Sequence, residues 1–222
     1  MEKRDNRPII LVVFALVAVG VVTAILIGRS GDDSGGGTSA EGCREVADPA
    51  PKQVSLDAPK QVLKRGDAAS ALVETSCGSF TIELDTERAP KTANSFAFLA
   101  EEGFYDGVPF HRVVPDFVVQ GGDPKGDGTG GPGYSVDEKP PSNLAYTKGV
   151  VAMAKSSAEP PGRSGSQFFV VIGADAGLPP EYALVGEIGE GMDVVERIGS
   201  LGTPEEKPKQ TVVIDSVTIE QG

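Results

Sequence analysis

The sequence predicts a mainly β domain that folds as a closed antiparallel barrel with two helices. The first observation is the composition: the chain of 222 residues contains 29 Gly, 17 Pro and no Trp, which favours many turns over long helices. The second is a series of short strand-like runs in the C-terminal two thirds of the chain. Closing such strands into a barrel removes the exposed edges of a sheet, and a chain of this length has room for one domain and additional segments.

The predicted strands are short apolar or alternating segments. Residues 80–84 alternate apolar and polar side chains, as in a strand with one buried face. Residues 71–75 can pair with them as a hairpin across a Ser-Cys-Gly turn. The remaining predicted strands are residues 117–120, 150–153, 167–172, 183–188 and 211–219.

Two segments have the spacing of short helices. Pro90 suits the first turn of a helix, and four apolar residues from Ala93 to Ala100 recur at i, i+3, i+4 and i+7. Gly103 is placed to end this helix. The second predicted helix covers residues 192–198, with its valines and isoleucine facing inward.

The N-terminus predicts a membrane anchor. Residues 9–27 form a run of 19 residues without a charge, and basic residues at positions 3, 4 and 7 precede it. As a helix the run would be about 29 Å long, close to the hydrocarbon thickness of a bilayer. We therefore expect a cytoplasmic N-terminus over residues 1–8, a transmembrane helix over residues 9–28 and an extracytoplasmic C-terminal part in the cell membrane. A cleaved signal peptide is the alternative, and it would also export the domain.

The following segment, residues 29–68, is predicted to connect the anchor to the domain. Its Gly/Ser-rich part, residues 32–40, has the composition of a flexible tether. The sequence of residues 50–54 recurs at residues 58–62, but two copies of five residues are too short for a repeat fold. This part is either an extended connector or an arm that packs on the domain, which we expect to occupy residues 69–222.

The two cysteines predict a disulfide. Cys43 lies in the connector and Cys77 in the turn of the predicted hairpin. An even number of cysteines in an exported chain favours pairing. Closing a loop of this length would stabilise the fold by about 3–4 kcal/mol. Two free thiols are the alternative.

Charge and residue types argue against several functions. The formal net charge is −12, so no basic surface would attract nucleic acid. One histidine and two distant cysteines do not form a typical zinc site, and no EF-hand spacing occurs. The glycine-rich residues 126–133 lack the Gly-Lys-Ser/Thr ending of a phosphate-binding loop. We expect no metal and no cofactor.

Residues 110–123 carry the most specific chemistry. Arg112 stands five residues before Phe117 and eight before Gln120, and the segment closes on Gly-Gly-Asp. An apolar ring and a permanent cation could hold a proline ring while a donor engages its backbone. This segment resembles the signature of the cyclophilins, the cyclosporin-binding class of peptidyl-prolyl cis-trans isomerases.

Further blocks keep the cyclophilin order over roughly the last 150 residues. They are residues 103–107, 126–134, 149–154, 165–169, 184–186 and 190–192. The resemblance implies a closed barrel of eight strands with a helix capping each end. A single anchor before such a domain resembles bacterial membrane-linked members.

The resemblance assigns roles to the central residues of the site. Arg112 would donate to the prolyl nitrogen or a neighbouring carbonyl, and Gln120 would position Arg112 or the substrate. Phe117 and Phe169 would form the proline pocket, with Leu178 adding to its wall. His111 is expected to be structural, since rotation about a peptide bond requires no proton abstraction.

The remaining predicted substrate contacts include departures from the family pattern. Val118 stands in place of the usual methionine, Lys155 in place of asparagine, and Tyr182 where many eukaryotic members have histidine. Ala154 and Lys155 would meet the peptide largely through their backbone. Gly128 lies in the glycine-rich run, which could bound the site for the residue preceding proline.

The resemblance predicts an active isomerase that assists folding of exported proteins, acting on proline-containing polypeptides. A non-catalytic proline-peptide-binding or scaffolding module on the same fold is the alternative, motivated by the changes at Val118 and Lys155. Gly177 stands where strong cyclosporin binders have tryptophan, so weak cyclosporin binding is expected. We also expect a monomer.

Overall fold

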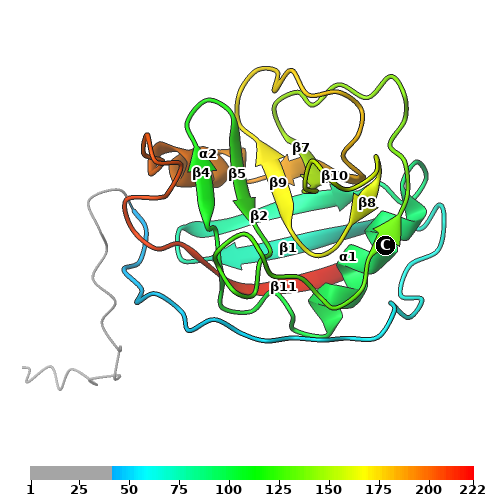
Figure 1. Cartoon of the computed structure of the whole chain (residues 1–222), viewed down its shortest axis with the longest axis horizontal. Coiled ribbons are helices and arrows are strands. Elements are labelled where there is room, and N and C mark those ends of the chain that lie inside the picture. The colour runs from blue at the N-terminus through cyan, green and yellow to red at the C-terminus, as the bar shows by residue number, and fades with distance from the viewer. Residues whose placement is uncertain (1–41) are drawn as a thin grey trace, which may run out of the picture. The chain divides into compact units, whose positions relative to one another are not determined.

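The computed structural model of the chain describes residues 42–222 (Figure 1). The predicted cytoplasmic segment, the predicted transmembrane helix and residues 29–41 of the predicted connector lie outside the described residues. Within residues 42–222, no helix is both long and apolar enough to cross a bilayer.

The described residues form one large sheet, one two-stranded ribbon and two helices. The bounds are β1 (Ala69–Thr75), β2 (Gly78–Leu84), α1 (Pro90–Glu101), β3 (Val108–Pro109), β4 (Arg112–Val114), β5 (Val118–Gly121), β6 (Val136–Asp137), β7 (Val150–Met153), β8 (Arg163–Ser164), β9 (Phe168–Val171), β10 (Leu184–Glu190), α2 (Met192–Ser200) and β11 (Val213–Gln221). The sheet has the order β3-β11-β1-β2-β10-β7-β9-β5-β4, with antiparallel neighbours throughout, and β6 pairs with β8.

The predicted mainly β architecture with two helices is confirmed. Each predicted strand and both predicted helices are present, with ends that differ by a few residues. Gly103 directly follows Glu102, the C-cap residue of α1, as predicted. The strands β3, β4, β6 and β8 were not predicted, because two or three residues are too few to show an alternating pattern.

The predicted closed barrel of eight strands is wrong. Among the described residues the main sheet has nine strands, and its edge strands β3 and β4 do not pair with each other. Only Phe110 and His111 separate these two strands along the chain. Pro109 has no N–H to donate, while the Phe110 N–H bonds to Val212 O at 2.9 Å. The barrel therefore stays open between β3 and β4, where residues 108–114 run from one edge strand of the sheet to the other.

The sheet is strongly curled. Figure 1 shows β4, β5 and β9 running steeply across β1, β2 and β11. The core inside the curl contains Phe168 of β9, whose ring meets Phe96, Tyr105 and Phe110 edge-on at centroid distances of 5.5, 5.7 and 6.3 Å. The next residue, Phe169, belongs to a separate apolar cluster. Because neighbours on a strand point to opposite faces, β9 supplies one ring to the core and one to a second face of the sheet.

The segment before the domain lies against it as an extended arm, residues 43–63 (Figure 1). The Lys52 N–H donates to Pro124 O at 2.8 Å and the Leu56 N–H donates to Pro132 O at 2.7 Å. The Leu63 side chain is buried in the main core, and its N–H donates to Asn94 Oδ1 at 2.9 Å. Of the two possibilities open from the sequence, these contacts match the packed arm.

The predicted disulfide is present at the start of this arm. Cys43 and Cys77 are bonded, both side chains are buried, and the two residues are 34 positions apart along the chain. Beside it, the Arg44 N–H donates to Ser76 O at 2.6 Å. The bond thus fixes the first described residues of the arm to the turn between β1 and β2.

Removing this bond is expected to lower the free energy of unfolding by about 3–4 kcal/mol, because the unfolded chain regains the entropy of an open loop. Denaturant unfolding of the full chain, with and without reductant, measures the change. The double variant Cys43→Ser, Cys77→Ser serves as the control, since its unfolding should not respond to reductant. Equal unfolding midpoints for the oxidised and reduced wild-type protein would contradict the prediction.

Candidate active site

Nine of the ten predicted catalytic and substrate-binding residues line one cavity with a volume of about 210 Å³. The strands β4, β5 and β9 and the loops that follow β7 and β9 supply its walls. These residues are Arg112, Phe117, Val118, Gln120, Ala154, Lys155, Phe169, Leu178 and Tyr182. The tenth, Gly128, lines a neighbouring cavity.

Strand register explains why residues so far apart in sequence meet. In the β4–β5 hairpin, Arg112 is the direct partner of Gln120, which in turn is the partner of Phe169 on β9. Directly paired residues of antiparallel strands point to the same face of a sheet. The guanidinium, the amide and the ring therefore form a row across three strands. Phe117, in the hairpin turn, places its ring 5.9 Å from the Arg112 guanidinium carbon.

The Arg112 guanidinium is held by two acceptors. Its Nη1 donates weakly to Gln120 Oε1 at 3.4 Å, and its Nε donates to Glu206 Oε2 at 2.7 Å. Gln120 was predicted from the sequence, whereas Glu206 was not. Glu206 stands 94 residues from Arg112, and no sequence motif links the two.

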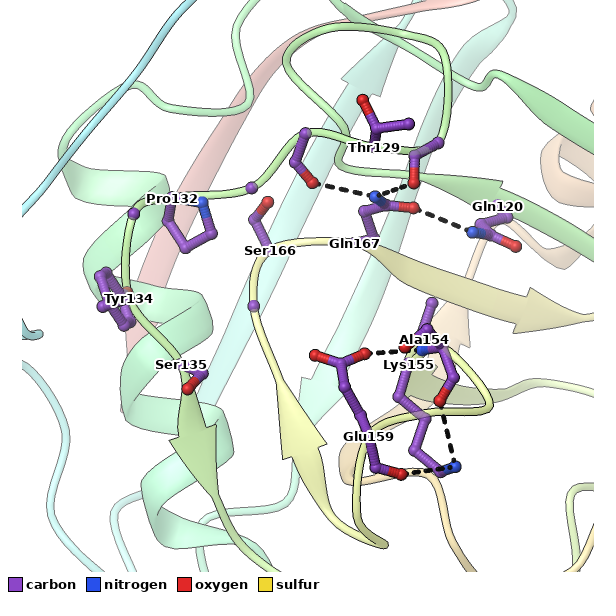
Figure 2. A pocket seen from close by; sticks show the side chains of 16 residues that line it. Gln120, Thr129, Pro132, Tyr134, Ser135, Ala154, Lys155, Glu159, Ser166 and Gln167 are labelled. Atoms are coloured by element: carbon purple, nitrogen blue, oxygen red, sulfur yellow. Dashed lines mark hydrogen bonds between the residues drawn. The ribbon is translucent and has the colours of Figure 1, made fainter.

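A chain of amide hydrogen bonds continues from Gln120 to the glycine-rich loop, residues 126–133. Gln120 Nε2 donates to Gln167 Oε1 at 3.1 Å, and Gln167 Nε2 donates to Gly128 O and Gly130 O, each at 3.0 Å (Figure 2). Gln167 was not among the predicted site residues. Its position directly before β9 in the Gly-Ser-Gln-Phe-Phe block was the signal that could have identified it.

The second cavity lies beside the first and has a volume of about 770 Å³. Gln120, Ala154 and Lys155 line both cavities, and the glycine-rich loop forms one wall of the larger one (Figure 2). Gly128 lies on this wall. Because the two cavities meet at Gln120, a single bound peptide could occupy both.

The apolar wall of the smaller cavity depends on a buried tyrosine. Tyr146 Oη donates to Tyr182 O at 2.6 Å and accepts the Tyr182 N–H at 2.9 Å. Burial raises the pKa of Tyr146 to about 12, so the hydroxyl remains protonated and keeps both bonds. These bonds hold the Tyr182 ring perpendicular to Phe169, at a centroid distance of 5.6 Å. Tyr146 was not predicted from the sequence, because a buried supporting residue of this kind has no local sequence pattern.

Lys155 turns its ammonium group toward the protein. The side chain is only 5% exposed, and its Nζ lies 3.3 Å from Glu181 Oε2 and 5.4 Å from the centre of the Tyr182 ring. Nζ also donates to Glu159 O at 3.3 Å. Arg112 and Lys155 both border the cavity, but the positive charge of Lys155 is paired with the carboxylate of Glu181.

Comparison with known families agrees with the geometry of the cavity. A sequence model for "Cyclophilin type peptidyl-prolyl cis-trans isomerase/CLD" matches residues 71–219. The chain belongs to the cyclophilin-type peptidyl-prolyl cis-trans isomerase family. Members of this family accelerate rotation about the peptide bond before proline, and the chain is such an isomerase by homology.

Individual relatives of this cyclophilin cover most of the matched domain. Peptidyl-prolyl cis-trans isomerase-like 1 of Aspergillus fumigatus is 39% identical over 161 residues, which are 70% of this chain and 98% of the relative. The isomerase ppi1 of Schizosaccharomyces pombe is 42% identical over 139 residues, which are 61% of this chain and 88% of the relative. A cyclophilin-type isomerase of Cryptosporidium parvum, crystallised in the presence of the dipeptide Ala-Pro, has a TM-score of 0.63 and 28% identity and covers 69% of this chain and 99% of its own.

His111 of this cyclophilin directly precedes Arg112 and makes no strong hydrogen bond in the described structure. Its Nε2 is 3.5 Å from Gln120 Nε2, and its Nδ1 is buried without a partner in the described structure. Burial lowers the pKa of His111 below its usual 6.5, and the nearby charge of Asp123 opposes this change only in part. The imidazole is therefore neutral at pH 7. Across residues 42–222, no group of three His, Cys, Asp or Glu side chains could hold a metal ion.

The lowered pKa of His111 predicts a pH dependence of stability. The unfolded chain, with a histidine pKa near 6.5, binds the proton more readily than the folded chain. The free energy of unfolding should therefore fall as pH drops below about 6.5, until the lowered pKa is passed. Denaturant unfolding between pH 5 and 7.5 tests this, with His111→Gln as the control that lacks the titrating group. Equal slopes for the two proteins would contradict it.

Proposed function

We propose that the cavity at Arg112 rotates X-Pro bonds of exported polypeptides on the outer side of the cell membrane. The observation that carries the catalytic part is the row of Arg112, Gln120 and Phe169 in a cavity of about 210 Å³ that has both polar and apolar walls. Cavities for drug-sized ligands are usually about 300–1,000 Å³, so this one suits a single ring better than a larger molecule.

The reaction needs few groups. Resonance holds the peptide bond planar with a barrier of about 18–20 kcal/mol, and uncatalysed exchange before proline takes tens to hundreds of seconds. As the bond rotates, resonance is lost and the prolyl nitrogen becomes more pyramidal and more basic. A donor that interacts more strongly with this state than with the planar one lowers the barrier. No nucleophile takes part.

The residues of the cavity fit this chemistry. Phe117, Phe169 and Leu178 hold the proline ring, and the Arg112 guanidinium donates toward the prolyl nitrogen or the adjacent carbonyl. Gln120 orients Arg112 through the bond to its Nη1. These groups surround the ring from the apolar side and the polar side, which fixes it while the preceding residue turns.

The larger cavity takes the residues that precede proline. Gly128 and the rest of the glycine-rich loop would border that part of the chain, while Ala154 and Lys155 would lie where the two cavities meet. The crystallisation of the Cryptosporidium parvum isomerase with the dipeptide Ala-Pro is consistent with a site that accepts proline and the residue before it.

Two features support action outside the membrane. The apolar run and the basic residues before it favour an anchor with the domain on the far side. The buried Cys43–Cys77 bond is typical of oxidising compartments, where disulfides persist. Exported chains acquire their proline isomers in that compartment, so assistance to their folding is the proposed role.

Weak cyclosporin binding is part of this proposal. Gly177 directly precedes Leu178, which lines the cavity, and apart from its two chain neighbours no residue has an atom within 4 Å of the place where its Cβ would be. Gly177 itself therefore supplies no aromatic ring to a bulky cyclic ligand.

Arg112→Ala should lower kcat/KM for a proline peptide by about 10²–10³, because a preorganised donor is lost. The free energy of unfolding should change little, since the side chain is partly exposed. A proline-peptide isomerisation assay on the full chain in detergent, with Arg88→Ala as the surface control, measures this. Unchanged activity of Arg112→Ala would overturn the role of Arg112. A wild-type protein that binds the peptide without accelerating its isomerisation would favour the non-catalytic module.

The proposed location predicts how lysines react in intact cells. A membrane-impermeant amine reagent should label lysines of the domain, such as Lys209, because they lie outside the membrane. Lys3 should be labelled only after the cells are opened. Mass spectrometry of the labelled peptides reads both out. Labelling of the domain only after lysis would contradict an extracytoplasmic location.

A further inference from the structure

The shortest hydrogen bond of the Arg112 guanidinium is made to Glu206, outside the predicted site. The 2.7 Å bond from Nε to Glu206 Oε2 is shorter than the 3.4 Å bond from Nη1 to Gln120 Oε1. Because guanidinium is planar, two acceptors on different nitrogens fix both the position and the plane of the group. The remaining N–H groups are left to meet a substrate.

The backbone around Glu206 is tied to β4. After α2 the chain makes a tight turn, residues 202–208, in which the Glu206 N–H donates to Thr203 O and the Thr203 N–H donates to Lys207 O, both at 2.9 Å. Glu206 O accepts the Val113 N–H, also at 2.9 Å. The carboxylate is thus presented to Arg112 by a turn whose backbone is bonded to the next residue of the same strand.

Glu206 adopts an unfavourable backbone conformation to do this. Its φ is +61°, and within residues 42–222 only Asp116 is another non-glycine residue with positive φ. The left-handed region costs free energy for a residue with a Cβ and costs glycine little. Residues that keep such a conformation are concentrated at functional sites.

Stability alone does not account for this ion pair. The side chains of Arg112 and Glu206 are 33% and 50% exposed, and ion pairs with this exposure contribute little to folding. The same ion pair can matter more for catalysis than for folding, because a small displacement of a catalytic group lowers the rate strongly.

We propose that Glu206 is a positioning residue that holds the Arg112 guanidinium in the orientation needed for catalysis. The inference rests on the proposed role of Arg112. Its substrate is the same X-Pro bond, and Glu206 acts only through Arg112.

The decisive variant is Glu206→Gly, because glycine removes the carboxylate and also suits a φ of +61°. We expect kcat/KM in the isomerisation assay to fall about tenfold, mainly through kcat, while the unfolding midpoint of the full chain is unchanged or raised. Glu206→Gln retains a neutral acceptor and should recover part of the loss. Glu205→Ala removes a neighbouring exposed carboxylate that makes no ion pair in the described structure and should leave both quantities unchanged.

A double-mutant cycle separates this inference from the proposed function. In an Arg112→Ala background, Glu206→Gly should have no further effect on kcat/KM. If Arg112→Ala lowers activity and Glu206→Gly does not, the positioning role is overturned while the role of Arg112 stands. If Arg112→Ala itself has no effect, the proposed function fails first. An activity loss in Glu206→Gly that accompanies a lower unfolding midpoint, or that persists in the Arg112→Ala background, would assign Glu206 a structural role instead.

Discussion

The register of β4, β5 and β9 is the constraint on which the site depends. It places Arg112, Gln120 and Phe169 side by side, and a slip of one residue would turn each to the opposite face. Packing fixes this register from the other side, where Phe168 is enclosed by rings of the core. A close backbone approach adds to it: a Cβ on Gly122 would lie 2.4 Å from Ser166 O. The core and the active site are therefore two consequences of one strand alignment.

The polar side chains of the site are tied to other groups of the protein. Lys155 is drawn away toward Glu181 and the Tyr182 ring, whereas Arg112 is held from both sides by Gln120 and Glu206. Gln120 is itself bonded to Gln167, which is anchored on carbonyl groups of the glycine-rich loop. The arm, which lies outside the residues that the family model matches, bonds to the backbone on both sides of these carbonyl groups, through Lys52 to Pro124 O and through Leu56 to Pro132 O.

Sequence and structure agree where the pattern is long enough to be read. Strands of four or more residues and both helices follow from apolar or periodic runs. The motif from Arg112 to Gln120 supplies four of the nine cavity residues, and the family resemblance supplied the other five. The sequence pattern could not show whether the barrel closes. Closure depends on whether the two edge strands, β3 and β4, form hydrogen bonds with each other. Glu206 and Tyr146 were missed for a related reason. Each acts through a contact between segments distant in sequence, and nothing in its immediate neighbours distinguishes it from an ordinary surface glutamate or core tyrosine.

The disulfide also determines what happens to the chain when a protease cuts it. The arm, residues 43–63, is extended and partly exposed, which is the kind of segment that proteases cut. Because the bond joins Cys43 to Cys77, a single cut anywhere between them leaves the two fragments linked. The catalytic domain would then stay attached to everything that precedes Cys43 after such a nick, and a cut in the arm would separate the fragments only if the disulfide were also reduced.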